Sequence, residues 1–219
     1  KLASINEGLP RVRELSIQGN SSAISENERE LLAREIDQLF EHLLSLSNTR
    51  DVNDEYIFAG SATGSQAYDV DGQFQGDEQV RQLNIAPGVT IRTGDSGVDV
   101  FENIADGANT FAIIRELSSA LRLGDDVDPL DRRDAIAAAQ VKLDSAMARV
   151  NEVRSSTGVR LNRLDDHAEL NTAFSLQVSK SISSLEDLDF ASAASELSLQ
   201  MTSLQAAQQV YVKTQNLTI

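Results

Sequence analysis

Residues 131–185 decide the fold, and they read DRRDAIAAAQVKLDSAMARVNEVRSSTGVRLNRLDDHAELNTAFSLQVSKSISSL. Alternating steps of four and three residues from Ile136 onward pass through fifteen positions, of which ten are apolar. This 3.5-residue period keeps one apolar seam along one side of a helix and is typical of a coiled coil. Pro129 precedes the seam, with Asp128 as a candidate N-cap, and no proline follows. A helix of roughly 80 Å needs other helices beside it. We therefore expect an elongated antiparallel helical bundle that buries seam residues such as Leu161.

The composition limits the classes of function. The chain has 219 residues, and its net charge of −15 would repel nucleic acid and anionic membranes. The absence of cysteine excludes disulfides, thiolate metal sites and cysteine nucleophiles. No stretch approaches the run of about 18 apolar residues that spans a membrane, and no secretory signal opens the chain. Because no initiating methionine is present, we interpret the chain as a fragment or a processed product.

Two helices are expected near the N-terminus. Apolar steps of three and four predict a helix over residues 1–17. Pro10 lacks a backbone N–H, so this helix should be kinked there or begin there. Ser25 and Glu28 form a capping-box pattern, which predicts a second helix over residues 26–50.

The helical period returns over residues 101–122, which should pair antiparallel with residues 130–155. The seam of the long helix is interrupted at residues 186–189, where the apolar step is five. We predict a helix break there, with Asp189 capping a final helix that ends near residue 213. Residues 1–17 are too short to cover that last helix as well. Its apolar positions are therefore predicted to contact neighbouring subunits: Phe190, Leu197, Met201, Leu204 and Tyr211.

The middle of the chain differs in composition from both ends. Seven of the twelve glycines fall within the predicted insertion, which indicates turns and short strands instead of helix. Asp71-Gly72 and Pro87-Gly88 are the expected hairpin turns. The strand candidates are residues 56–59, 68–70, 73–75, 79–85 and 89–92. The predicted fold is mainly α, with a discontinuous helical rod domain (residues 1–51 and 101–219) and a small β-rich inserted domain (residues 52–100).

No residue pattern predicts chemistry. His42 and His167 lie on predicted helices away from the apolar seam, so both should be exposed. Asp69, Asp71 and Asp77 resemble part of a calcium loop, but the spacing lacks the final glutamate of an EF-hand, and hairpin-turn chemistry accounts for the Asp-Gly pair. The glycines match no phosphate-binding or dinucleotide-binding motif. We therefore predict no catalytic residue, no metal site and no cofactor.

Several segments together resemble the bacterial flagellin family. RVRELSIQ at residues 11–18 is similar to the N-terminal rod region of flagellins, and LEDLDFAS at residues 185–192 is similar to their C-terminal region. LLSLSNT at residues 43–49, leading to YIFAG at residues 56–60, resembles the branch of the family that joins the flagellar hook to the filament. LQAAQ at residues 204–208 favours the same branch.

The resemblance implies a structural role in the extracellular bacterial flagellum, as a packing adaptor between hook and filament and not as an enzyme. It implies export through the flagellar type III channel without a cleaved signal peptide, with the help of an export chaperone. The implied partners are hook-associated protein 1, flagellin and further copies of the same chain. It also implies that this chain is a core fragment without the family's terminal arms and that this fragment is monomeric. A flagellin that forms the filament itself remains the alternative, and a ligand-binding module or enzyme that uses the β insertion is less favoured.

Overall fold

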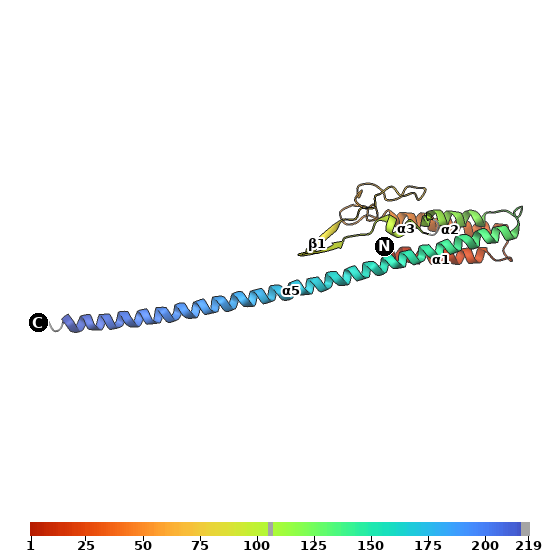
Figure 1. Ribbon diagram of the computed structural model, residues 1–219. Coiled ribbons are helices and arrows are strands. Elements are labelled where there is room, and N and C mark those ends of the chain that lie inside the picture. The colour runs from red at the N-terminus through yellow and green to blue at the C-terminus, as the bar shows by residue number, and fades with distance from the viewer. Residues whose placement is uncertain (105–106, 216–219) are drawn as a thin grey trace. The chain divides into compact units, whose positions relative to one another are not determined.

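The computed structural model describes residues 1–104 and 107–215, and the chain forms two compact units, residues 1–164 and a segment that begins at Asp165. The elements are α1 (Leu2–Gly19), α2 (Glu26–Ser47), β1 (Gln82–Ala86), β2 (Val89–Arg92), α3 (Gly97–Phe101), α4 (Thr110–Leu121) and α5 (Pro129–Gln215) (Figure 1). None of the helices in the described ranges combines the length and the apolar character that crossing a bilayer requires. The predicted mainly helical class with a small antiparallel sheet is confirmed.

Helices α1, α2, α4 and the first part of α5 form a bundle around one apolar core. α2 packs against both α1 and α4, and all four helices supply side chains to a single buried cluster. Removing each large side chain of this kind from water contributes roughly 1.5–3 kcal/mol. The fully buried members include Ile5, Leu9, Ile36, Leu43, Phe111, Leu117, Ile136 and Leu143.

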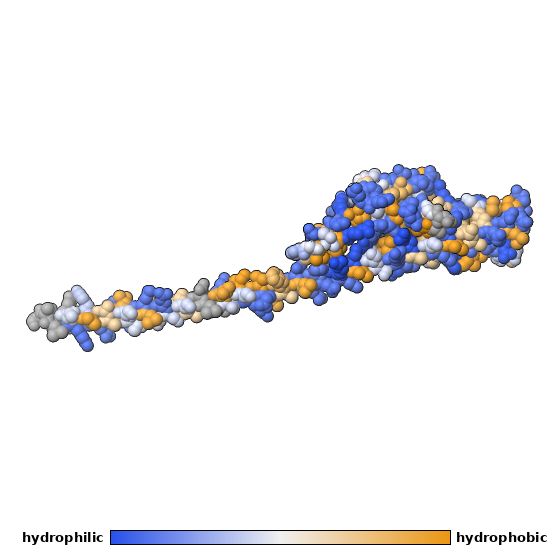
Figure 2. Space-filling model, viewed as in Figure 1, coloured by the Kyte–Doolittle hydropathy of each residue, from blue (hydrophilic) through white to orange (hydrophobic). Residues whose placement is uncertain are grey.

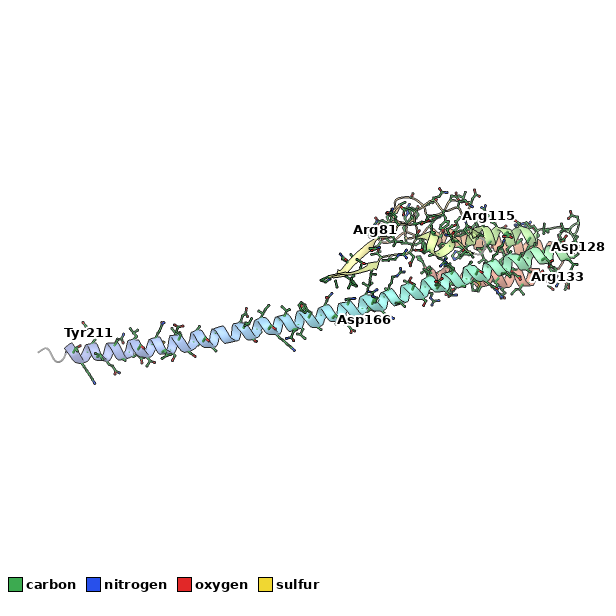
Figure 3. The ribbon with its side chains drawn as sticks, in the orientation of Figure 1. Arg81, Arg115, Asp128, Arg133, Asp166 and Tyr211 are labelled. Atoms are coloured by element: carbon green, nitrogen blue, oxygen red, sulfur yellow. The ribbon has the colours of Figure 1, made fainter. Side chains whose placement is uncertain are left out.

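Two of the predicted helix caps, Ser25 and Asp128, are confirmed. Ser25 Oγ accepts a hydrogen bond from the Glu28 N–H (3.4 Å), and the Glu28 carboxylate accepts one from the Ser25 N–H (2.9 Å), which completes the capping box. Asp128 Oδ1 accepts a hydrogen bond from the Leu130 N–H (2.8 Å) and so caps α5 (Figure 3). α1 does not begin at Pro10, because this residue lies inside the helix.

Within residues 101–122, which were predicted as one helix, α3 ends at Phe101 and α4 begins only at Thr110, so that prediction is wrong. Between them Gly107 has a positive φ of 74°, which a continuing right-handed helix does not allow. Asn109 Oδ1 then accepts a hydrogen bond from the Ala112 N–H (2.6 Å) and starts α4. The apolar period was misleading because Ile104, which lies between the two helices, is buried like its helical neighbours.

Helix α5 continues through the predicted break. The backbone is helical over residues 186–189, so the predicted break and the predicted helix start at Asp189 are wrong. No glycine or proline follows Gly158, and the helical hydrogen bonds do not depend on the apolar pattern. The step of five residues therefore moves the apolar stripe around the helix without ending it.

The segment between α2 and α3 contains one hairpin and several ordered loops. β1 and β2 pair antiparallel around the predicted turn, in which Gly88 has a φ of 76°. The strands predicted at residues 56–59 and 68–75 are wrong, because only the isolated bridges Arg50–Tyr56 and Tyr68–Phe74 form there. These loops are too irregular for ladder pairing and depend on side-chain packing instead.

Aromatic side chains of these loops pack against aromatic side chains of the helices. The ring centroid of Tyr68 lies 4.9 Å from that of Phe111 and 5.5 Å from that of Phe101, and Phe58 lies 5.6 Å from Phe101. Such tilted and edge-to-face pairs contribute beyond their buried area. The loops thus share a core with α4, while the division into a helical domain (residues 1–51 and 101–219) and an inserted domain (residues 52–100) stays a prediction.

Candidate subunit-interaction surface

The bundle covers the first part of α5. Lys142 Nζ lies 2.9 Å from a carboxylate oxygen of Glu116 on α4, which places α4 and α5 side by side as predicted. On the α1 side, Arg13 Nε lies 2.5 Å from Asp144 Oδ1. The apolar seam of this part of α5 is buried, and its buried residues are Ile136, Ala139, Leu143, Ala146 and Val150.

Helix α1 covers the apolar seam of α5 only as far as the point opposite its own first residue. Gln140 Nε2 donates to Ser16 Oγ (3.0 Å) and Arg13 pairs with Asp144, so α1 runs antiparallel to α5. Continuing this pairing at equal rise places the first residue of α1 opposite about residue 155. Leu161 lies beyond that point and is 55% exposed, so its predicted burial is wrong. The apolar period of α5 therefore extends further along the chain than the part of α5 that α1 covers.

A polar contact holds α5 just before its exposed part. Arg160 Nη1 donates to Asp95 Oδ1 (2.7 Å), its Nη2 donates to Asp95 Oδ2, and the Thr157 hydroxyl donates to the same carboxylate (3.2 Å). The hydrogen bonds to Asp95 raise the pKa of the Arg160 guanidinium. The side chain of Arg160 is only 17% exposed and that of Asp95 only 10%. The two residues therefore form a bidentate ion pair that is largely shielded from water. The sequence does not reveal this pair, because no local signal links residues 65 positions apart.

The segment of α5 from Asp165 to Gln215 presents two apolar stripes. The first stripe consists of Val178, Ile182 and Leu185, and all three side chains are exposed. The second stripe contains the residues predicted as a subunit interface, each more than half exposed: Phe190, Leu197, Met201, Leu204 and Tyr211. Figure 2 shows apolar side chains gathered on the visible face of this segment. Exposed apolar surface of this extent typically marks a protein-interaction site.

The two stripes lie on different sides of the helix. Five residues at about 100° each carry Phe190 to a point roughly 140° around the helix from Leu185. One flat partner surface could therefore not cover both stripes at once. The assignment of the second stripe to subunit contacts stays a prediction, but its exposure agrees with that role.

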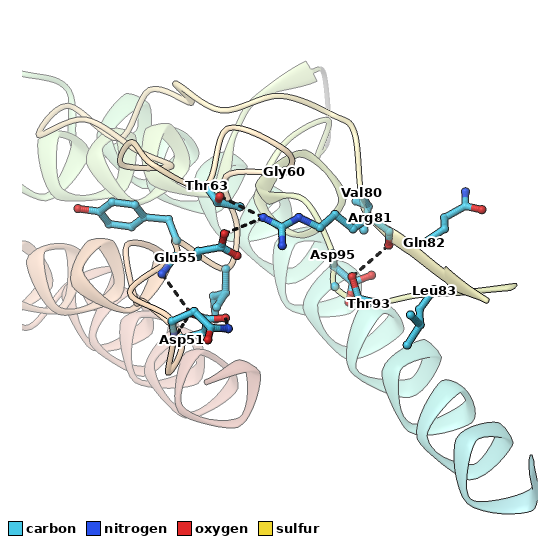
Figure 4. A pocket seen from close by; sticks show the side chains of 14 residues that line it. Asp51, Glu55, Gly60, Thr63, Val80, Arg81, Gln82, Leu83, Thr93 and Asp95 are labelled. Carbon is cyan, nitrogen blue, oxygen red and sulfur yellow. Dashed lines mark hydrogen bonds and ion pairs between the residues drawn. The ribbon is translucent and has the colours of Figure 1, made fainter. Parts of the chain in front are cut away.

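An open cleft of about 430 Å³ lies beside the hairpin (Figure 4). Arg81 reaches across it to Glu55 (2.8 Å) and Thr63 (3.3 Å). Asp95, which also lines the cleft, is engaged by Arg160. These polar groups neutralise one another, so the cleft does not present the convergent, unpaired groups that a ligand site needs.

The other polar residues singled out from the sequence lie in turns or near the surface. His42 is exposed and His167 is partly exposed. Asp69 Oδ1 accepts a hydrogen bond from the Asp71 N–H (2.9 Å), and Asp77 Oδ1 accepts one from the N–H of residue 61 (2.7 Å). Within the described ranges, no group of three His, Asp or Glu side chains could hold a metal ion. The aspartates serve to shape loops.

Comparison with known proteins shows the family to which this chain belongs. The model of the bacterial flagellin N-terminal helical region matches residues 1–63, and that of the flagellin C-terminal helical region matches residues 141–218. The two ranges together make up more than half of the chain. The chain belongs to the bacterial flagellin family. As a flagellin-family protein it is a structural component of the extracellular bacterial flagellum, not an enzyme, and it interacts with other axial subunits.

Individual relatives of this flagellin-family protein include flagellar hook-associated proteins. Flagellar hook-associated protein 3 of Escherichia coli is 25% identical over 233 aligned positions, which cover 100% of this chain and 74% of that protein. The crystal structure of hook-associated protein 3 from Legionella pneumophila has a TM-score of 0.76 at 17% identity and covers 85% of this chain and 90% of that one. Xanthomonas campestris FlgL gives a TM-score of 0.74 at 17% identity, with 84% and 91% covered. These structures share the fold of this chain over the covered part.

Proposed function

We propose that this flagellin-family chain is the structural subunit that joins the flagellar hook to the filament. The main support is the likeness to hook-associated protein 3 of Escherichia coli, which extends over the whole chain. The exposed apolar stripes of α5 agree with a protein whose work is to pack against neighbours.

In this role the protein acts by packing. The bundle of the first unit packs around one apolar core, and the two stripes of α5 are buried against adjoining subunits. Burial of apolar area supplies the driving force, and the acidic surface keeps unassembled chains soluble.

The proposed partners are hook-associated protein 1 on the hook side, flagellin on the filament side and further copies of this chain. We propose that it leaves the cell through the flagellar type III channel without a cleaved signal peptide, escorted by an export chaperone. Outside the flagellum, the chain is proposed to be monomeric.

The second candidate is a flagellin that builds the filament itself, because both matched family regions also occur in flagellins. A ligand-binding role for the insertion would have to use the cleft beside the hairpin, where the polar groups already pair with one another.

Deletion of the gene distinguishes the two flagellar roles. If the protein is the junction subunit, the mutant should make intact hooks without filaments and should shed unpolymerised flagellin into the medium. Expression of the gene from a plasmid should restore the filaments. A mutant that makes hooks but releases no flagellin would indicate the filament role, and normal filaments would contradict both.

A further inference from the structure

A recess of about 260 Å³ lies at the end of the bundle where α1 turns into α2 and α4 turns into α5. Three arginines line it, Arg29 from α2 and Arg132 and Arg133 from the start of α5, together with one carboxylate, that of Asp125 (Figure 3). We call it the arginine recess. Because the whole chain carries a net charge of −15, this lining is opposite in charge to most of the protein.

Arg29 is a buried arginine and is only 3% exposed. Its Nη2 donates to Asp125 Oδ1 (2.8 Å) and to the Leu123 carbonyl (3.4 Å), and its Nη1 donates to the Ile24 carbonyl (3.3 Å). These bonds hold the guanidinium group between the two loops. Its Nε is buried and has no hydrogen-bond acceptor among the described residues. The recess therefore contains a charged side chain with an unused donor.

Asn20 lines the same recess and lacks the opposite kind of partner. Its Oδ1 is buried without a hydrogen-bond donor. Within the described ranges, four side-chain nitrogen or oxygen atoms are buried and unpaired, and two of them belong to residues that line this recess. Unpaired buried polar atoms destabilise a protein, so folded chains keep few of them. An occupant that accepts from Arg29 and donates to Asn20 would satisfy both atoms.

The two arginines of α5 share little negative charge. Arg132 Nη1 donates to the Gly124 carbonyl (3.2 Å) and lies 3.6 Å from Asp125 Oδ1, which Arg29 already engages. Arg133 is exposed and forms no ion pair in the part of the chain that the structure describes. One carboxylate thus serves two guanidinium groups, and the third has none.

The other acidic side chains of these two loops do not line the recess. Glu28 accepts a hydrogen bond from the Ser25 N–H (2.9 Å), and Asp128 accepts one from the Leu130 N–H (2.8 Å). Both carboxylates are therefore used to start helices. The excess of arginine in the recess is left for a group from outside the chain.

An acidic peptide segment meets all of these requirements. A carboxylate accepts charge-assisted hydrogen bonds from guanidinium groups, and the backbone N–H of the same residue supplies the donor that Asn20 lacks. A chloride or sulfate ion offers no donor, and a water molecule offers no negative charge. The recess is smaller than the pockets of roughly 300–1,000 Å³ that hold drug-sized ligands, and this suits a single side chain.

We propose that the arginine recess docks an acidic peptide segment of an adjoining subunit in the assembled flagellum. This inference rests on the proposed structural role. The carboxylate of the incoming residue pairs with Arg132 and Arg133, and its backbone N–H donates to Asn20 Oδ1. The site lies within the first unit and is polar, whereas the stripes of α5 are apolar. Such a charged contact fixes the register and the choice of neighbour more than it adds affinity.

Zero-length cross-linking tests the docking directly. Arg133→Lys places a primary amine at the recess, and a carbodiimide joins an amine only to a carboxylate that touches it. Arg154→Lys is the matched control, because Arg154 is also an exposed arginine of α5 without an ion pair among the described residues. In hook–filament preparations, Arg133→Lys should give a product in which the new amine is joined to an Asp or Glu of an adjoining subunit. Absence of this product, or an equal yield from the control, would overturn the proposal.

Peptide titration tests the chemistry of the recess on the isolated chain. The blocked peptide Ala-Asp-Asp-Ala should shift the NMR signals of the Arg29 Nε–H and of the Asn20 side-chain amide in a saturable way. The blocked peptide Ala-Asn-Asn-Ala should leave both signals in place. If sodium sulfate shifts both signals as much as the acidic peptide does, or if neither probe shifts them, the recess is not a peptide site.

Charge reversal separates this contact from the junction role. Arg133→Glu should leave the melting temperature unchanged, because the side chain is exposed. It should reduce the number of attached filaments about tenfold, because it opposes the incoming carboxylate with a like charge. Arg154→Glu should retain attachment. If gene deletion sheds flagellin but Arg133→Glu attaches filaments normally, the junction role stands and only the docking site is refuted.

Discussion

Leu143→Asp should destabilise the bundle by about 4 kcal/mol, whereas Leu161→Asp should change its stability by less than about 0.5 kcal/mol. Leu143 is fully buried between the helices, where an aspartate would leave an unpaired charge and a poorly filled space. Leu161 belongs to the same apolar series but is 55% exposed, so an aspartate there stays in water. The two substitutions are chemically identical and differ only in whether another helix covers the site.

Urea unfolding of the two variants, followed by circular dichroism, measures this difference. We expect a large loss for Leu143→Asp and a curve close to that of the parent chain for Leu161→Asp. Equal losses would mean that the cover over α5 extends past residue 161, contrary to the structure.

Asp95→Ala should cost about 3 kcal/mol, because it leaves the guanidinium of Arg160 largely buried without its partner. Asp99→Ala is the matched control, since Asp99 pairs with Arg92 but both side chains are about 40% exposed. An exposed pair of that kind is worth less than about 1 kcal/mol.

Thermal melting of both alanine variants compares the two ion pairs. A clearly larger shift for Asp95→Ala supports its role as the contact that holds the hairpin region on α5. Indistinguishable shifts would show that the Asp95–Arg160 pair is as weakly coupled to folding as a surface pair.

The local features of the fold could be predicted from the sequence. Ser25 and Glu28 identified the start of α2, and Asp128 identified the start of α5, because capping depends on a few adjacent atoms. The continuity of α5 was misjudged at residues 186–189 for a related reason. Apolar periodicity reports which side of a helix is buried, whereas the end of a helix is set by glycine, proline and caps, and neither glycine nor proline occurs there.

Features that depend on distant contacts could not be predicted. The period of the seam is the same at Leu143 and at Leu161, so nothing local reveals that α1 covers only the first of them. The Asp95–Arg160 pair joins two elements whose proximity arises only from the fold. The insertion was predicted to form short strands because its glycines and its Asp-Gly and Pro-Gly pairs indicate hairpin turns. Aromatic packing around Tyr68 replaces most of that strand pairing.

The candidate surface was partly visible in the sequence. The second stripe was found from its spacing, because the predicted helices left no partner for it.

The exposed stripes of α5 are central to the proposed role as assembly surfaces, and a double substitution in the second stripe tests this role most directly. Leu197→Asp with Leu204→Asp adds two charges to that stripe, and Ser195→Asp with Thr202→Asp adds the same charge to the opposite side of the helix. All four residues are exposed, so both double variants should fold and melt like the parent chain.

The decisive measurement is the number of filaments attached to hooks, counted by electron microscopy, together with the flagellin released into the medium. We predict bare hooks and released flagellin for the stripe variant and attached filaments for the control. Normal filament attachment in the stripe variant would contradict the role of α5 as an assembly surface.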